Sequence, residues 1–192
     1  MDYKTVFAII AIAIGFVSYI PYFKDTFAGR TKPHMFTWFI WAVLEGTAFF
    51  AQASKGAGAG AWVTGTTSIL CVSVFLVSLS RGEKKITFGD KLSLAGAVLG
   101  VVLWYFSRNA LTAVILVSIT DFFGFIPTFR KSYFKPYEET VKLYVMSAIK
   151  LIFALLALKS FNLTTALYPA SLILVNAAFV IMTVIRRKSL KL

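Results

Sequence analysis

The stretch IPYFK at residues 20–24 closes the first apolar run of the chain, and it returns as IPTFR at residues 126–130. Each copy is followed by a basic loop that contains a second proline, Pro33 or Pro136, and then by another apolar segment. This echo predicts that the chain consists of two related halves, each of which begins with a proline-bearing helix.

Two further pairs of residues support the duplication. Thr37 matches Thr140 at a spacing of 103 residues, and Phe75 matches Phe179 at a spacing of 104, while the prolines of the two motifs, Pro21 and Pro127, are 106 residues apart. Three anchors thus give nearly the same offset. Their agreement favours an internal repeat over chance similarity between apolar segments.

The composition indicates a membrane protein. Of the 192 residues, 58% are hydrophobic and the mean hydropathy is +0.78, whereas soluble domains are about 45–50% apolar. A helix needs about 20 apolar residues to cross the hydrocarbon core of a bilayer, and backbone polar groups in lipid have to be satisfied within the helix. The sequence therefore predicts seven transmembrane helices, at about residues 5–23, 36–54, 61–80, 92–106, 110–129, 140–158 and 163–185.

The net charge of +12 does not indicate a nucleic-acid partner, because the basic residues lie mainly in the loops between apolar segments. With the N-terminus outside, 14 of the 20 lysines and arginines fall on the cytoplasmic side and four on the outer side, and Lys142 and Lys150 lie within the sixth segment. This is the positive-inside bias of membrane proteins. It predicts an integral membrane protein with a cytoplasmic C-terminus, and the short termini favour a prokaryotic inner membrane.

The topology predicts two parallel repeats. A unit of three helices ends on the side opposite to its start, so one extra helix is needed before the second unit can run in the same direction. We therefore expect a first repeat at residues 1–85, a linker helix at 86–108 and a second repeat at 109–192. The apolar segment at 92–106 has no counterpart in the repeat.

This 3+1+3 layout, with a proline near the inner end of the first helix of each half, resembles the SWEET, SemiSWEET and PQ-loop transporter superfamily. SWEETs are built from parallel repeats related by an axis along the membrane normal. The Pro-Gln pair of that superfamily stands here as Pro21-Tyr22 and Pro127-Thr128. The spacing of Trp38 and Trp41 also resembles the Trp-x-x-Trp signature of PnuC-type vitamin transporters, which share the layout.

Ionisable residues in the middle of apolar segments are the first candidates for a site, because each costs about 2.5–3.5 kcal/mol to insert. Glu45 in the second segment and Lys150 in the sixth lie at similar depths, and we expect them to form an ion pair, either purely structural or serving as a gate or substrate anchor. If Glu45 and Lys150 pair, Asp121 in the fifth segment has no basic partner at its depth, which makes it a candidate for proton or cation coupling. The alternative is a neutral acid bonded to a carbonyl or to Thr120.

Three other residues complete the predicted site. The resemblance implies that Asn176 in the seventh segment faces the substrate, because SWEET-like proteins present an asparagine there. Pro21 and Pro127 each remove a backbone hydrogen bond, and the interpretations are a hinge beside the inner gate or a simple helix end.

Trp38 and Trp41, near the inner end of their segment, are typical of an interfacial aromatic belt.

The sequence offers no catalytic or metal-binding constellation. One cysteine, Cys71, and one histidine, His34, cannot supply a metal cluster, and no phosphate-binding loop or Ser-His-Asp set is present, so we expect neither an enzyme nor a cofactor. The predicted function is passive or cation-coupled transport of a small polar solute by rocking of two bundles. A non-transporting receptor or assembly partner is the alternative, and a homo-oligomer stays open.

Overall fold

The computed structural model describes residues 3–54, 59–107, 109–158 and 161–190. Within these ranges the chain is all-helical, as predicted, with no strand. The helices are α1 (Tyr3–Phe27), α2 (Met35–Ser54), α3 (Ala59–Arg81), α4 (Phe88–Phe106), α5 (Ala110–Phe134), α6 (Val141–Leu156) and α7 (Leu163–Ser189), with a short 3-10 turn, η1 (Pro136–Glu138), before α6.

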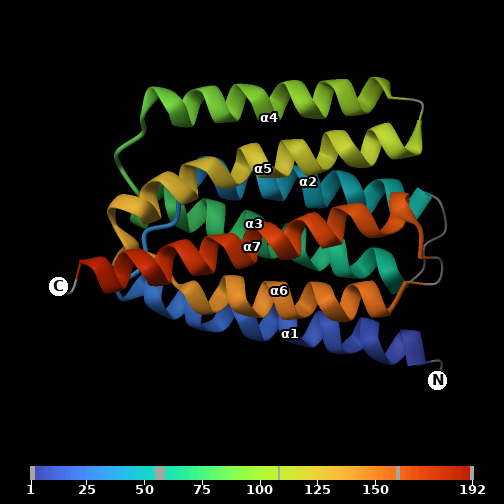
Figure 1. Ribbon diagram of the computed structural model, residues 1–192, viewed down its shortest axis with the longest axis horizontal. Coiled ribbons are helices and arrows are strands. Elements are labelled where there is room, and N and C mark those ends of the chain that lie inside the picture. Colours follow the sequence, from blue (N-terminus) through green and yellow to red (C-terminus); the bar gives the residue numbers. More distant parts are fainter. Residues whose placement is uncertain (1–2, 55–58, 108, 159–160, 191–192) are drawn as a thin grey trace.

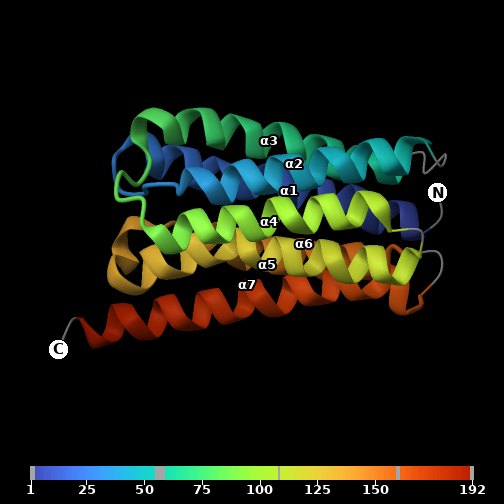
Figure 2. The ribbon, with the colours of Figure 1, turned by 90° about the horizontal axis from the view of Figure 1, so that it is seen from above.

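The seven helices lie side by side in one elongated bundle, and each runs opposite to the one before it (Figure 1). The chain therefore begins at one end of the bundle and finishes at the other, as the second view also shows (Figure 2). Residues 28–34, 82–87 and 135–140 connect helices at the end where the C-terminus lies, which we call the C-terminal end. The sequence has a glycine-rich stretch at 55–60, where a turn is expected; residues 55–58 lie outside the described ranges, and Gly60 belongs to α3.

The three helices before α4 in the sequence and the three helices after it show the same pattern of contacts. In the described residues, α3 packs on both α1 and α2, and α7 packs in the same way on α5 and α6. Two further contacts, α1 with α6 and α2 with α5, join the two sets of helices. The remaining helix, α4, lies at the edge of the bundle against α5 and α2 (Figure 1).

Both motif prolines lie inside their helices. Pro21 is six residues before the end of α1, and Pro127 is seven residues before the end of α5, so neither proline ends its helix. The helices consequently extend further toward the C-terminal end than the sequence predicts, and α5 carries Arg130 and Lys131 within it. A third interior proline, Pro169, lies near the start of α7 and was not among the expected hinges.

Three helices are long and apolar enough to cross a bilayer: α1, α4, and α7 over Thr165–Ser189. The apolar stretches found in the described parts of α2 and α3, Met35–Gly46 and Gly65–Arg81, are shorter. Large apolar side chains cover the outside of the bundle, and those of α4 include Phe88, Leu92, Leu99, Leu103, Tyr105 and Phe106. The bundle thus presents apolar side chains both to its core and to its surroundings.

The edge helix α4 is held by close packing and a strong N-cap. The Thr87 side chain accepts from the Asp90 backbone, and the Asp90 carboxylate accepts from the Thr87 backbone, which forms a capping box. Further along, Gly100 lets α4 approach α5 so closely that an added Cβ would lie 1.9 Å from the Thr120 hydroxyl oxygen. That hydroxyl donates to the Leu116 carbonyl oxygen at 2.8 Å and cannot move without losing this bond.

We predict that Gly100→Ala destabilises the protein by about 1–3 kcal/mol, the usual cost of overpacking. The measurement is the thermal unfolding midpoint of the purified protein. Adding Thr120→Ala, which removes the clashing hydroxyl, should restore most of the loss. Gly89→Ala is the matched control, because its Cβ would lie 3.7 Å from the nearest atom, and a loss as large as that of Gly100→Ala would contradict the prediction.

Candidate functional site

A cavity of about 70 Å³ lies in the middle of the bundle, and every helix except α4 contributes to its lining. This volume accommodates a few water molecules or a small chemical group. All four residues predicted for the site line it: Glu45, Asp121, Lys150 and Asn176. The helices thus bring together polar side chains that lie up to 131 positions apart in the sequence.

Asp121 is the most conspicuous of the four, because half of its carboxylate has no partner. Only 4% of the residue is exposed. Its Oδ1 accepts a long hydrogen bond from the Tyr168 hydroxyl at 3.5 Å, whereas Oδ2 is buried without a hydrogen-bond partner in the described structure. The expected alternative partner, Thr120, instead donates to the Leu116 carbonyl.

Glu45 and Lys150 share the cavity without forming an ion pair. No ion pair within 4.0 Å joins these two described side chains, so the direct contact expected from their depths is not formed. The stem of Lys150 lies across α1, where a Cβ on Gly15 would be 3.4 Å from its Cδ. The small residue at position 15 thereby leaves room for the lysine, and the charge of Glu45 interacts with both Lys150 and Asp121 at longer range.

Asn176 is 4% exposed and lines the cavity from α7. Its Nδ2 donates to the Leu172 carbonyl oxygen one turn earlier, at 2.8 Å. The amide is thereby held in a fixed orientation by its own helix. This fixed amide adds hydrogen-bonding capacity to the α7 wall of the cavity.

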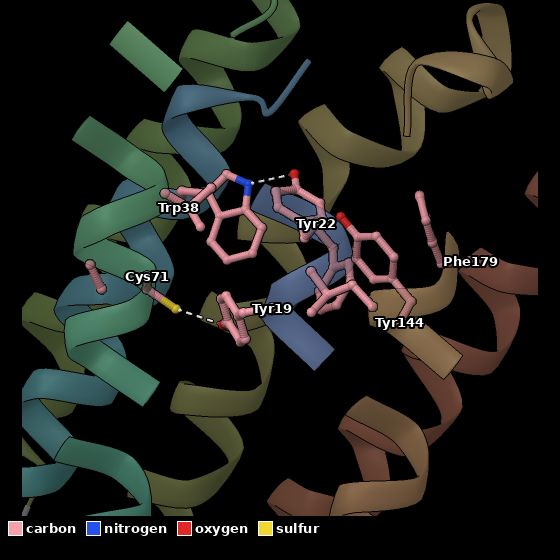
Figure 3. Packing of buried hydrophobic residues seen from close by; sticks show 10 residues of the cluster. Tyr19, Tyr22, Trp38, Cys71, Tyr144 and Phe179 are labelled. Atoms are coloured by element: carbon pink, nitrogen blue, oxygen red, sulfur yellow. Dashed lines mark hydrogen bonds between the residues drawn. The ribbon is translucent and has the colours of Figure 1, made fainter. Parts of the chain in front are cut away.

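An aromatic layer separates the cavity from the C-terminal end. In Figure 3, Tyr22 of α1 lies between Trp38 of α2 and Tyr144 of α6. The Trp38 indole donates to the Tyr22 hydroxyl at 3.1 Å, and the rings of Tyr144 and Phe179 are 4.2 Å apart. The members of this aromatic layer are Tyr19, Tyr22, Trp38, Phe125, Tyr144 and Phe179.

The interfacial position expected for Trp38 is therefore wrong. Trp38 does lie near the start of α2, but it is 1% exposed and points into the core. Trp41 lines the cavity. A signal was present in the sequence: Trp41 and Phe125 each lie four residues from a mid-segment acid, Glu45 and Asp121 respectively. In a helix that spacing places both side chains on one face.

Buried hydroxyl groups form the next layer toward the C-terminal end. The Thr128 hydroxyl of α5 donates to the Thr37 hydroxyl of α2 at 2.9 Å, and the hydroxyls of Thr31 and Thr140 are hydrogen-bonded to each other. Both bonds join residues from different halves of the sequence. The layer contains Thr26, Thr31, Thr37, Thr128, Thr140 and Thr183.

An ionic lock closes the end of the bundle, and we define it as Lys131 with Glu139 and Lys32 with Glu138. The Lys131 side chain is only 1% exposed and pairs with the buried Glu139 carboxylate. Its Nζ also donates to the backbone oxygens of Lys32 at 2.7 Å and Glu138 at 3.0 Å. Lys32 in turn pairs with Glu138 at 2.6 Å, so the lock joins the 28–34 loop to the 135–140 loop.

Two more ion pairs attach the C-terminal end of α5 to the connection between α3 and α4 and to the first turn of α4. Arg130 binds both oxygens of Asp90 at 2.8 Å, and Lys135 binds Glu83 at 2.7 Å. Burial alone would raise the pKa of Glu83, but hydrogen bonds from Lys135 and the Lys85 backbone outweigh it and lower that pKa below its ordinary value. These contacts fix the C-terminal end of α5.

His34 is fully buried beside this cluster, with its Nε2 3.4 Å from Asp90 Oδ2. Burial lowers the pKa of His34 from its ordinary 6.5 to about 4, with help from the nearby Lys131 and Arg130, although the Asp90 carboxylate opposes the shift. The imidazole is therefore neutral near pH 7. No group of three or more possible metal-ligating side chains occurs in the described part of the chain.

Comparisons with known proteins add no relative: no protein-family model, curated protein or solved structure matches the chain. The geometry of the cavity and of the layers beside it therefore carries the functional argument.

We predict that His34 makes stability depend on pH between about 6.5 and 4. The unfolded state binds a proton to His34 more strongly than the folded state does, so the contribution of His34 is complete above pH 6.5 and is lost as the pH falls toward 4. The full loss is about 3 kcal/mol. Unfolding midpoints measured across this window should fall less steeply in His34→Gln.

Asp25→Asn is the control for this titration. Hydrogen bonds from Arg30 and Thr140 outweigh burial and lower the pKa of Asp25 below its ordinary value, so its stabilising effect is lost at lower pH. An unchanged slope in His34→Gln, or an equal flattening in Asp25→Asn, would show that His34 is not the titrating group.

Proposed function

We propose that this protein is an integral membrane transporter that carries a small polar solute through the central cavity by alternating access. The observation that carries the proposal is the convergence of Glu45, Asp121, Lys150 and Asn176 on one cavity. These side chains come from helices of both halves, and the aromatic layer, the hydroxyl layer and the ionic lock separate them from the C-terminal end.

The surface and charge of the bundle support a position in the bilayer. Exposed apolar side chains cover the sides of the helices, while the ion pairs gather at the C-terminal end. Lipid is then the partner of the apolar surface. The distribution of basic residues supports an orientation with the C-terminal end in the cytoplasm and the N-terminus outside.

The helix contacts support a 3+1+3 arrangement with repeats at residues 1–85 and 109–192 and a linker helix at 86–108. Replacing α1, α2 and α3 by α5, α6 and α7 turns each contact of the first set into a contact of the second, and turns α1 with α6 into α5 with α2. This is the relation expected from a twofold axis between parallel repeats. It is in keeping with the resemblance to the SWEET and PQ-loop superfamily.

In this mechanism the structure represents a state closed at the cytoplasmic end. Opening that end requires the two halves to separate, which breaks the Thr37–Thr128 hydrogen bond, the Lys32–Glu138 ion pair and the hydrogen bond from Lys131 to the Lys32 backbone oxygen. Pro21 and Pro127 lie beside the aromatic layer, where each removes one helical hydrogen bond. We assign them the role of hinges that let the ends of α1 and α5 swing apart.

Cysteine accessibility tests alternating access without knowledge of the solute. In a Cys71→Ala background, Ser147→Cys introduces one thiol into the cavity lining. In sealed vesicles we predict that a membrane-impermeant thiol reagent reaches this cysteine from either side, because the cavity opens to each side in turn. Lys131→Met, which breaks the lock, should raise labelling from the cytoplasmic side several-fold.

The control is Ser93→Cys, a buried position on α4 that does not line the cavity, which should stay unlabelled from both sides. A receptor or an assembly partner has no need to expose its cavity alternately. Labelling of Ser147→Cys from one side only, unchanged by Lys131→Met, would contradict the transport proposal and favour that alternative.

A further inference from the structure

We infer that the cavity accepts a small monovalent organic cation of the ammonium type, and that it exchanges this cation for a proton. The inference rests on the proposed transport function and specifies its solute. It follows from the charge balance of the cavity, from an unpartnered carboxylate oxygen and from the aromatic walls.

The charge balance favours a single positive charge. The residues that line the cavity include two carboxylates, Glu45 and Asp121, and one ammonium group, that of Lys150. With all three ionised the cavity carries one net negative charge. An uncompensated charge in a buried site is strongly unfavourable, so the empty cavity requires one bound proton, and a monovalent cation can take its place.

The position of the missing partner is also defined. Asp121 Oδ2 is a buried acceptor without a hydrogen-bond donor in the described structure, and such atoms are rare in folded proteins. The indole nitrogen of Trp41, another lining residue, is likewise buried and unpartnered. The positive charge of an alkylammonium group can pair with the Asp121 carboxylate, and a hydroxyl group on the same solute can donate to Oδ2.

Aromatic walls distinguish an organic cation from a metal ion. The rings of Trp41 and Phe125 meet at 4.5 Å on the lining, and Gly124 makes room for the indole, whose Nε1 would be 3.3 Å from an added Cβ. The π-faces of aromatic rings attract ammonium and alkylammonium groups. Hard metal cations instead need a shell of several oxygen ligands, and no group of three or more His, Cys, Asp or Glu side chains that could hold a metal ion occurs among the described residues.

Binding of the cation is coupled to release of a proton because both bind to the same carboxylates. Besides Asp121 on α5, the other helices around the cavity contribute titratable side chains. These are Tyr19, Glu45, Cys71, Tyr144, Lys150 and Tyr168. On α4, Asp90 is bound to Arg130, and Lys91 and Tyr105 are exposed. When a cation binds, the proton leaves a carboxylate for bulk water, and the net charge of the cavity stays the same.

The test uses three probes of similar shape and different charge: choline, its neutral isostere 3,3-dimethylbutan-1-ol, and zwitterionic glycine betaine. The full chain in lipid nanodiscs is heated with each probe near pH 8 and again about two pH units lower. We expect choline to raise the unfolding midpoint, as a ligand of the folded state does, and to do so less at the lower pH. In weak buffer, each bound choline should release about one proton.

Variants assign the effect to the cavity. Asp121→Asn should abolish both the choline shift and the proton release, and Glu45→Gln provides the same test if Asp121→Asn fails to fold. Trp41→Leu should weaken choline binding about tenfold by removing an aromatic face. The control Asp25→Asn, a carboxylate bound to Arg30 outside the cavity, should keep the shift and the proton release.

Equal stabilisation by the neutral isostere, no stabilisation by choline, or a choline shift that survives in both Asp121→Asn and Glu45→Gln would overturn the cation inference. These results leave the transport proposal standing if Ser147→Cys is still labelled from both sides. Conversely, choline binding with proton release would support the cation site even if Ser147→Cys is labelled from one side only, and that labelling result would contradict the transport proposal.

Discussion

The closed end of this bundle depends on the burial of one ammonium group, that of Lys131. Taking a charge out of water is costly unless partners surround it, and Lys131 finds three: the Glu139 carboxylate and the backbone oxygens of Lys32 and Glu138. One partner comes from the first half of the chain and two from the second. The two halves therefore have to meet at this point for the charge to be satisfied.

This constraint links the surface loops to the central cavity. With the loops held together, the Thr37–Thr128 bond and the aromatic layer below them close as well, and the cavity is isolated from the C-terminal end. Breaking a buried pair by removing one partner costs about 3–5 kcal/mol. A lock of this strength can be opened only if other interactions form, and in the proposed cycle these form at the opposite end of the bundle.

Much of the fold follows from the sequence, because long apolar segments and their spacing can be recognised without knowing how the helices pack. The seven helices and the similar depth of Glu45 and Lys150 were predicted for that reason. The role of Lys131 was not, because the sequence suggests that the helix ends soon after Pro127. The structure continues α5 to Phe134, which moves Lys131 from an expected loop to the interior, where a lysine is rare.

The missing Glu45–Lys150 contact has a similar cause. Depth along a helix can be counted from the sequence, but the rotation of each helix cannot. Gly15 gives the Lys150 stem a path along α1, so the lysine and the glutamate line one cavity without pairing. The inward orientation of Trp38 likewise depends on its partner Tyr22, sixteen residues earlier on a different helix.

In the proposed cycle the two halves move against each other around the cavity, and the distance between them at the C-terminal end reports this motion. Spin labels at Ser80→Cys on α3 and Ser189→Cys on α7, in a Cys71→Ala background, report on the C-terminal end by double electron–electron resonance. The account predicts two distance populations in lipid, with Lys131→Met shifting weight to the longer one. A single narrow distance that does not respond to Lys131→Met would contradict it.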